Sequence, residues 1–295
     1  MPKAIRESFQ ENTASTESIP IRLPASGNIP GSHRIIPTIQ AELIKLNNTD
    51  YHSHILPGLD DGAGDITESI LMLRELYRQG VQRVYATPHF YADRESPEEF
   101  IRRREAAYTR IAPFLLQEDV PSLSLGAEIM ACPQLIGMQL DCLCFSDLPV
   151  MLFEFPVQRA EKWFCPTVDR IASAYNATPL LAHIDRYNWL SQNLLNDFLS
   201  LGDVCFQVNC AGLYDKKTQK NLVYLLEHDA MIVLGSDAHN LSDRKPDFEC
   251  AVRFFSAPPR RTGLFGHSLD PVQLSACISS SVSALSRRGN SCLLS

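Results

Sequence analysis

The sequence predicts an α/β fold in which parallel strands close into a barrel. Two observations predict this class: seven short apolar runs rich in β-branched residues, and helix-period stretches that alternate with them. Such alternation is typical of parallel βα units, and seven units favour a barrel over a small open sheet. The expected strands are residues 51–56, 82–86, 122–128, 150–155, 179–184, 204–209 and 231–236.

Two of the intervening stretches carry clear helix signals. Between Asp65 and Gly80, four apolar side chains share one helical face, and glycine is a favourable residue just past a helix end. These side chains are Ile66, Ile70, Leu73 and Tyr77. A second stretch begins with Ser96 as N-cap, Pro97 in the first turn and Glu99 completing a capping box. Both stretches are therefore expected to be helices.

The chain divides into three regions by composition. Residues 1–46 are rich in Pro, Ser, Thr and Asn without sustained periodicity, and we expect a flexible N-terminal extension. Residues 47–255 carry the alternating pattern and form the expected barrel domain. Residues 256–295 are Ser-rich and turn-rich, with at most one weak helix around Pro271–Leu285, and are expected to be an atypical C-terminal tail.

Composition narrows the class of protein. The 295-residue chain, with 45% hydrophobic residues, suits a globular core in one large domain or two small ones. A net charge of −7 argues against a general nucleic-acid binder, which needs a basic surface. We see no apolar signal segment, no run long enough to span a membrane, and no C-x-x-C pair among the nine cysteines. We therefore expect a cytoplasmic protein with reduced thiols.

Metal-capable side chains collect where the expected strands end. In a βα barrel, the C-terminal ends of the strands and the loops after them carry the reactive groups. Nine side chains occupy such positions: His52, His54, Asp61, His89, Glu128, Glu154, His183, Asp237 and His239. Each one alone has a plain alternative, such as a helix cap or a polar turn. Together they predict a metal site, because carboxylates crowded into one cavity repel one another unless cations are bound.

The ligand types indicate which ions would bind. Imidazole and carboxylate without thiolate suit Mn²⁺, Fe²⁺, Zn²⁺ or Mg²⁺. Nine ligands are too many for one ion and enough for two or three that share a bridging carboxylate. Multinuclear sites of this kind hold a bridging hydroxide and clamp a phosphate ester during in-line attack. Arg186 and Arg244 lie just beyond ligand positions and are candidates for binding phosphate, with surface salt bridges as the alternative.

Other hydrolytic chemistries lack their signature residues. The chain has no Cys followed by Arg six residues later, no G-x-S-x-G nucleophile elbow, no Walker loop and no G-x-G-x-x-G. Cys142 and Cys144 could bind a metal, but no second thiol pair faces them, so core packing is expected.

Six motifs occur along the chain in a familiar order: "DYHSHILPGLDDG", "GAEI", "LFEFP", "LLAHIDRY", "QVN" and "LGSDAHN". In this order they resemble the bacterial manganese-dependent protein-tyrosine phosphatases of the PHP (polymerase and histidinol phosphatase) superfamily, of the capsule and exopolysaccharide type. The resemblance spans Asp50–Pro246. It implies a distorted (β/α)7 barrel with a trinuclear manganese centre. It also implies phosphotyrosine as substrate, commonly on a tyrosine autokinase that controls polysaccharide chain length and export.

The resemblance further implies how the ligands divide among three ions. One ion would be held by His52, His54, Glu128 and Asp237, a second by Glu128, Glu154 and His183, and a third by Asp61, His89 and His239. Asp61 is preferred to Asp60 from its spacing to the H-x-H motif. Asp50 would accept a hydrogen bond that orients a histidine. Arg186 and Arg244 would hold the phosphate.

Two departures and two alternatives accompany this resemblance. The family begins almost at the H-x-H motif, whereas residues 1–46 precede it here. The family usually continues with further helices beyond Pro246, and the tail of this chain does not resemble them. Sequence divergence, disorder and a shifted reading frame are three alternative explanations. The alternative functions are a small-molecule phosphoesterase such as histidinol phosphatase and a non-catalytic PHP-like metal-binding module.

Overall fold

The computed structural model describes residues 48–256 and 269–292. The strands in these residues are β1 (Thr49–Ser53), β2 (Arg83–Ala86), β3 (His89–Phe90), β4 (Ser122–Leu125), β5 (Glu128–Met130), β6 (Val150–Glu154), β7 (Thr178–Leu181), β8 (Cys205–Asn209) and β9 (Met231–Gly235). The expected flexible extension lies outside the described residues. The same holds for residues 257–268 and 293–295 of the expected tail.

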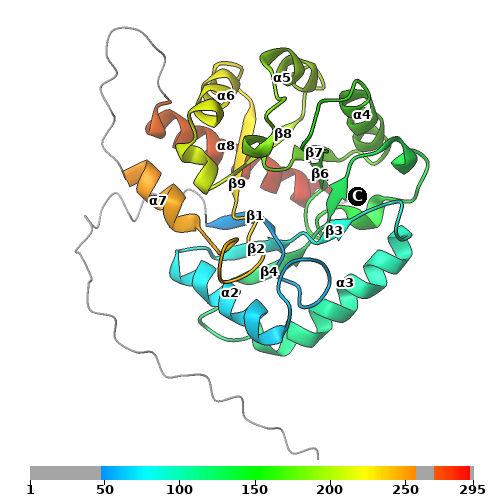
Figure 1. The fold of residues 1–295 in the computed structure, drawn as a ribbon, viewed down its shortest axis with the longest axis vertical. Coiled ribbons are helices and arrows are strands. Elements are labelled where there is room, and N and C mark those ends of the chain that lie inside the picture. Colours follow the sequence, from blue (N-terminus) through cyan, green and yellow to red (C-terminus); the bar gives the residue numbers. More distant parts are fainter. Residues whose placement is uncertain (1–47, 257–268, 293–295) are drawn as a thin grey trace, which may run out of the picture. The chain divides into compact units, whose positions relative to one another are not determined.

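The strands close into a ring of parallel neighbours (Figure 1). One sheet has the order β1-β2-β4 and the other the order β3-β5-β6-β7-β8-β9. Thr87 and Pro88 alone separate β2 from β3, and Gly126 and Ala127 separate β4 from β5, so two interrupted strands join the sheets. A parallel bridge between Ser53 and Ala238 closes the ring. Each interrupted strand counts once, so the predicted distorted (β/α)7 barrel is confirmed.

The helices lie on the outside of the strands in Figure 1. The helices that follow the strands are α2 (Ile66–Arg78), α3 (Pro97–Ile111), α4 (Phe164–Ala174), α5 (Gln192–Leu199), α6 (Lys216–Glu227), α7 (Phe248–Ser256) and α8 (Pro271–Cys292). Between β5 and β6, two short 3₁₀ turns at Pro133–Leu135 and Asp141–Leu143 replace a helix. In the part of the chain that the structure describes, no helix has the length and apolar character needed to cross a membrane.

Local sequence signals determine where the first two helices begin and end. Asp65 caps α2 by accepting a hydrogen bond from the backbone of Glu68, and Gly80 follows the helix with a φ of 96°, which glycine adopts without steric conflict. The predicted capping box of α3 is present, since Ser96 and Glu99 each accept a hydrogen bond from the other's backbone N–H. These predictions are confirmed.

The buried face of α2 differs in part from the prediction. Ile70 and Leu73 are buried as expected, and Met72 and Leu76 join them. Tyr77 is 44% exposed, so its predicted place on this face was wrong. Leu76 completes the face instead, because a residue three positions after Leu73 still points toward the strands.

Side chains that point into the barrel form an apolar layer at one end of it. Neighbouring residues of a strand point to opposite sides. On β6, Val150 and Leu152 join a cluster inside the barrel, while Met151 and Phe153 pack outward against the helices. We call this cluster the apolar layer; its members include Tyr51, Tyr85, Phe145, Val150, Leu152, Leu180, Cys205, Val233 and Leu285.

Helix α8 contributes Leu285 to the apolar layer. The sequence predicted at most a weak helix over Pro271–Leu285, but α8 is 22 residues long. Leu274 and Ile278 are also buried. The helix is tied to β9 by a hydrogen bond of 2.9 Å from Ile232 N to Ser281 Oγ. Packing against the barrel therefore supports a Ser-rich segment whose sequence alone is a weak helix signal.

Candidate metal centre

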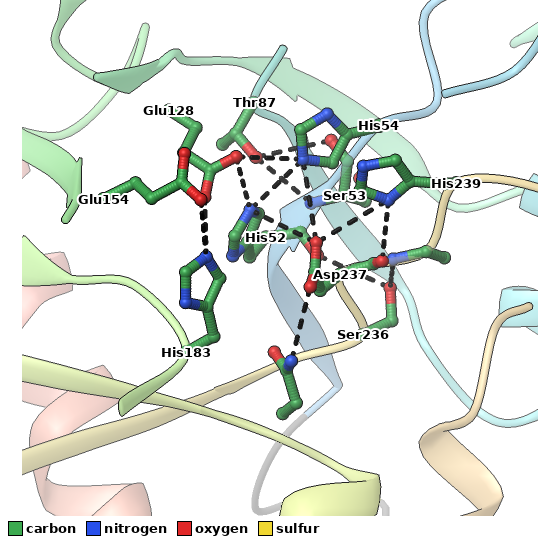
Figure 2. Close-up of polar contacts among 12 residues, drawn as sticks. His52, Ser53, His54, Thr87, Glu128, Glu154, His183, Ser236, Asp237 and His239 are labelled. Atoms are coloured by element: carbon green, nitrogen blue, oxygen red, sulfur yellow. Dashed lines mark hydrogen bonds and ion pairs between the residues drawn. The ribbon is translucent and has the colours of Figure 1, made fainter. Parts of the chain in front are cut away.

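All nine predicted ligands converge at the other end of the barrel interior. Figure 2 shows the cluster and labels all of them except Asp61 and His89. His52 lies on β1, His54 and Asp61 lie just after it, and the remaining residues come from five further strand ends. His89 begins β3, Glu128 begins β5, Glu154 ends β6, His183 follows β7, and Asp237 and His239 follow β9. Parallel strands place their C-terminal ends at the same edge, which is why residues so distant in sequence meet here.

Three histidines direct the same ring nitrogen into the centre. Nδ1 of His52 lies 3.0 Å from Gln207 Oε1, and Nδ1 of His54 lies 2.7 Å from Asp60 Oδ2. Nδ1 of His239 lies 2.9 Å from the carbonyl oxygen of Asp237. These oxygens only accept hydrogen bonds, so Nδ1 carries a proton and Nε2 is the nitrogen that can bind a cation. Outer hydrogen bonds of this kind orient histidine ligands in metal sites.

Glu128 lies among four of the histidines. Its Oε2 atom is 3.2 Å from His52 Nε2, 3.1 Å from His54 Nε2 and 2.9 Å from His89 Nδ1. Its Oε1 atom is 2.9 Å from His183 Nε2. The two oxygens thus face different groups of nitrogens, which is the arrangement expected of a carboxylate that bridges two cations.

Glu154 and Asp237 flank Glu128 on opposite sides in Figure 2. Oε1 of Glu154 lies 3.6 Å from His183 Nε2, and Oδ1 of Asp237 lies 3.7 Å from Nε2 of both His52 and His54. These contacts are too long for hydrogen bonds and leave room for an ion between the atoms.

The adjacent aspartates have different roles. Oδ1 of Asp61 lies 3.3 Å from His89 Nε2 and 3.4 Å from His239 Nε2, and its side chain is 59% exposed. Both oxygens of Asp60 are already engaged: Oδ1 accepts from Gly62 N, and Oδ2 accepts from His54 Nδ1 and His89 N. The geometry therefore favours Asp61 as the ligand and gives Asp60 the role of orienting His54.

Several buried polar atoms of the cluster lack hydrogen bonds. Within the described residues, the unpaired atoms of the cluster are Glu128 Oε2, Glu154 Oε2, His89 Nδ1, His183 Nδ1 and His239 Nε2. Nε2 of His52 and Nε2 of His54 lie only 3.3 Å apart. Buried polar atoms are normally paired, so this set of donors fits cations that would complete their coordination.

The electrostatics of the cluster lead to the same conclusion. Burial alone would lower the pKa of His52, but Glu128 and Asp237 raise it to about 9. Burial and the neighbouring Glu128 raise the pKa of Glu154. In the absence of metal, the buried carboxylates thus favour protonation of the neighbouring histidines or of Glu154. Divalent cations would supply the same positive charge.

Two candidate ligands have an unusual backbone conformation. His183 has φ 28° and Asp237 has φ 52°, in the left-handed region that residues other than glycine rarely adopt. The backbone N–H of His183 donates to Gln207 Oε1 at 2.6 Å, and that of Asp237 donates to the carbonyl of His52 at 2.8 Å. Strain of this kind concentrates at functional sites, where the surrounding structure maintains it.

Gln207 is a supporting residue that sequence reasoning missed. Its Oε1 atom accepts from both His52 and His183, while its Nε2 atom donates to Asn209 at 2.9 Å. Gly235 makes room for it, because a Cβ there would lie 2.7 Å from Gln207 Nε2. A glutamine inside an apolar strand was the available signal, since a buried amide needs specific partners.

Asp50 accepts a hydrogen bond from a histidine, as predicted, but from the backbone of that residue. Its carboxylate accepts from the backbone N–H of His52 at 3.1 Å and from Ser236 N at 2.9 Å and Oγ at 2.6 Å. Asp50 therefore fixes the backbones of β1 and of the segment after β9. Gln207, Asp60 and a backbone carbonyl orient the rings instead.

Arg186 and Arg244 lie at the exposed side of the cluster. Arg186 Nη1 donates to Asp237 Oδ2 at 2.9 Å, and Arg244 Nη2 donates to Asp237 Oδ1 at 3.0 Å. Arg244 Nη1 also donates to Asp61 Oδ2 at 3.3 Å. The side chains are 38% and 32% exposed. Both guanidinium groups are thus beside the candidate ligands and within reach of solvent, and their role in phosphate binding stays a prediction.

The thiols take no part in the centre. Cys142 and Cys144 are partly buried against the hydrophobic core, as predicted.

Sequence comparisons give a matching family model and several relatives. The model of the family described as "Capsular polysaccharide synthesis, CpsB/CapC" matches residues 48–258. Tyrosine-protein phosphatase YwqE of Bacillus subtilis (strain 168) is 34% identical over 209 residues, which cover 66% of this chain and 78% of that protein. Tyrosine-protein phosphatase CpsB of Streptococcus pneumoniae is 31% identical over 213 residues, which cover 67% and 85%.

A solved structure has the same fold. It comes from the crystal structures of YwqE from Bacillus subtilis and CpsB from Streptococcus pneumoniae, described as unique metal-dependent tyrosine phosphatases. The superposition has a TM-score of 0.64 at 24% identity and covers 81% of this chain and 94% of that chain. The arrangement of strands in Figure 1 is therefore one that a solved protein also adopts.

Proposed function

The chain belongs to the CpsB/CapC family of capsular polysaccharide synthesis, and from this premise we propose that it is a metal-dependent protein-tyrosine phosphatase, a phosphoric monoester hydrolase. The relatives YwqE and CpsB are tyrosine-protein phosphatases. One observation carries the proposal for this chain: five histidines and four carboxylates converge at one end of the barrel with buried, unpaired ligand atoms.

The proposed cofactor is a set of three divalent cations, with Mn²⁺ the best suited. One would be held by His52, His54, Glu128 and Asp237, a second by Glu128, Glu154 and His183, and a third by Asp61, His89 and His239. Three groups of ligand atoms, each within 4.8 Å of one another, support part of this division. They are His52, His54 and Glu128; His89, Glu128 and Glu154; and His54, Asp61, His89 and His239. His54, His89 and Glu128 each occur in two groups, so the cations would be neighbours. His183 and Asp237 lie outside these groups, and their assignment is supported by their contacts with Glu128 and with His52 and His54.

The chain's own residues would bind and orient the phosphate ester. Bound cations would supply positive charge to the phosphate and make a water molecule more acidic. Arg186 and Arg244 use only one or two of their five N–H donors on Asp237 and Asp61. The remaining donors can bind phosphate oxygens and hold the phosphorus atom toward the cluster. Asp60 and Gln207 would keep the histidine lone pairs directed at the cations.

The proposed physiological substrate is a phosphotyrosine-bearing bacterial tyrosine autokinase of capsule or exopolysaccharide synthesis. Membership of a capsular polysaccharide synthesis family supports this partner. The proposed compartment is the cytoplasm. Nucleic acid and membrane insertion have no part in the proposal.

The test combines metal content with activity. Purified protein is expected to hydrolyse a phosphotyrosine peptide when Mn²⁺ is present, to lose the activity in a chelator, and to keep it after thiol alkylation. His52→Ala is expected to bind less metal and to lose most of the activity. Activity that survives the chelator, or full activity in His52→Ala, would contradict the proposal.

The same assay separates the alternative functions. A small-molecule phosphoesterase would turn over histidinol phosphate faster than the phosphotyrosine peptide. A non-catalytic metal-binding module would bind Mn²⁺ and hydrolyse neither substrate.

A further inference from the structure

A cavity of about 590 Å³ opens beside the candidate metal centre. Asp61 and His89, two of the candidate ligands, line its inner end. Tyr91, Arg94, Glu95 and Arg103, from the loop after β3 and from α3, line the outer part. Small-molecule sites commonly measure about 300–1,000 Å³, so the cavity can hold an organic group as well as a phosphate.

A stack of flat groups leads outward from the metal centre along this cavity. The ring of Tyr91 lies 5.3 Å from the imidazole of His89, at 34° to it. The guanidinium carbon of Arg94 lies 4.0 Å from the centroid of the Tyr91 ring. A turn in which the carbonyl of Tyr91 accepts from Arg94 N at 3.0 Å holds the guanidinium over the ring.

Arg94 differs from the other arginines around the site. Arg103 is paired with Glu95, and both Arg186 and Arg244 are paired with Asp237. Within the described ranges, the guanidinium of Arg94 makes no ion pair, and its side chain is exposed. A planar cation that rests on one aromatic ring has its opposite face available for a second ring.

We propose that this cavity is the binding subsite for the tyrosyl ring of the substrate, with Arg94 and Tyr91 as its aromatic-selective wall. The inference rests on the proposed function, since it places the leaving group of the same phosphate ester. Asp61 and Glu95 make the cavity unfavourable for a second anion. The free guanidinium at its mouth disfavours a leaving group that carries an ammonium, as histidinol does. A neutral aromatic ring fits both constraints and can stack on the guanidinium.

The subsite is tested with Arg94→Ala, a substitution at an exposed side chain. KM for a phosphotyrosine peptide is expected to rise about 5- to 20-fold, the range of one cation–π contact between exposed and desolvated settings. KM for a phosphoserine peptide of the same sequence and the inhibition constant of inorganic phosphate are expected to stay within about 2-fold, because neither contains the ring. Arg94→Lys keeps the charge without the planar group and is expected to give an intermediate KM.

Arg170→Ala is the matched control, because Arg170 is an exposed arginine on α4 away from the cavity. An unchanged KM for the phosphotyrosine peptide in Arg94→Ala would overturn the subsite while leaving the phosphatase function intact. A parallel rise in the inhibition constant of inorganic phosphate would also overturn it, because Arg94 would then bind the phosphate. If the wild type with Mn²⁺ fails to hydrolyse phenyl phosphate, the proposed function and the subsite both fall.

Discussion

The two ends of the barrel interior bury side chains of opposite character on the same strands. On β6, Val150 and Leu152 lie in the apolar layer, and Glu154, the next inward residue, lies in the candidate metal centre. On β8, Cys205 lies in the apolar layer, and Gln207 supports two candidate ligands. Two residues along one strand therefore separate the apolar layer, which stabilises the fold, from the candidate metal centre, whose burial is unfavourable without compensation.

The difference teaches how a barrel can contain a charged site. Burial of apolar side chains stabilises the apolar layer by about 25 cal/mol per Å² of surface removed from water. Burial of a carboxylate without a partner is unfavourable, so the polar end depends on protons, guanidinium groups or cations for compensation. Substitutions at the apolar end should thus change stability, and substitutions at the polar end should change metal binding.

The largest effect is expected for Glu128→Gln. This substitution keeps the shape of the side chain but removes the charge that lies among four histidines. Loss of an outer hydrogen-bond partner alone costs about 10- to 100-fold in metal affinity or activity, so loss of a bridging ligand should exceed 100-fold. Metal content and phosphotyrosine-peptide hydrolysis measure the effect. Normal metal content in the variant would refute the bridging role.

Leu152→Ala tests the opposite end of the barrel. Leu152 is fully buried in the apolar layer, and its truncation leaves a cavity. The free energy of unfolding is expected to fall by about 2–5 kcal/mol, as measured by urea denaturation. The folded variant should still bind metal with wild-type stoichiometry. If metal binding falls as much as in Glu128→Gln, the two ends are not independent.

Gln207→Leu removes the amide that accepts hydrogen bonds from His52 and His183. His52 and the backbone of His183 both lose an acceptor. Metal affinity is expected to fall about 10- to 100-fold, in the range known for outer-shell partners of histidine ligands. Isothermal titration with Mn²⁺ measures this. Gln207→Glu retains an acceptor and should recover part of the affinity, whereas Gln192→Leu, on the surface of α5, should have no effect.

The smallest effect is expected at Asp247, a half-buried carboxyl group outside the ligand set. Burial, reinforced by Asp50, raises the pKa of Asp247 to about 7. Between about pH 4 and pH 7, the folded protein holds a proton that the unfolded chain has released, so the free energy of unfolding falls as pH rises through this window.

Asp247→Asn removes this contribution, because asparagine does not ionise and can still accept from Ala211 N. The variant is expected to be about 1–2 kcal/mol more stable than the wild type at pH 8 and nearly equal to it at pH 4. The difference at pH 8 is smaller than the full pKa shift implies, because Asp247 is partly exposed to solvent. Urea denaturation of chelator-treated protein at both pH values provides the measurement. Asp197→Asn, at an exposed position on α5, is the control. If the free energies of unfolding of Asp247→Asn and the wild type differ equally at both pH values, the raised pKa of Asp247 is contradicted.

Much of the fold could be predicted because its signals are local. Each strand of a parallel barrel is buried on both faces, so it occurs in the sequence as a short apolar run. The caps of α2 and α3 are also set by neighbouring residues, such as Gly80 and Ser96. Helix α8 was harder to predict, since its stability depends on contacts of Leu274 and Leu285 with strands far away in the sequence.

The roles of some polar residues could be predicted from local motifs, and the roles of others depend on contacts that are distant in sequence. The spacing of the motifs was sufficient to propose nine ligands, which the fold brings together. It was insufficient for Asp50, which holds backbone groups of β1 and of Ser236, 186 residues away. It also missed Gln207, which lies 155 residues from His52 in the sequence.

By itself, the sequence determined the seven strands and the chemistry of the residues at their ends, because hydrophobic periodicity and motif spacing are properties of short segments. Only the tertiary structure decided which nitrogen of His52, His54 and His239 faces the centre, that Asp60 supports a histidine, and that Arg94 rests on Tyr91. These features depend on hydrogen bonds and stacking between segments that meet only when the barrel closes, and no local pattern specifies such contacts.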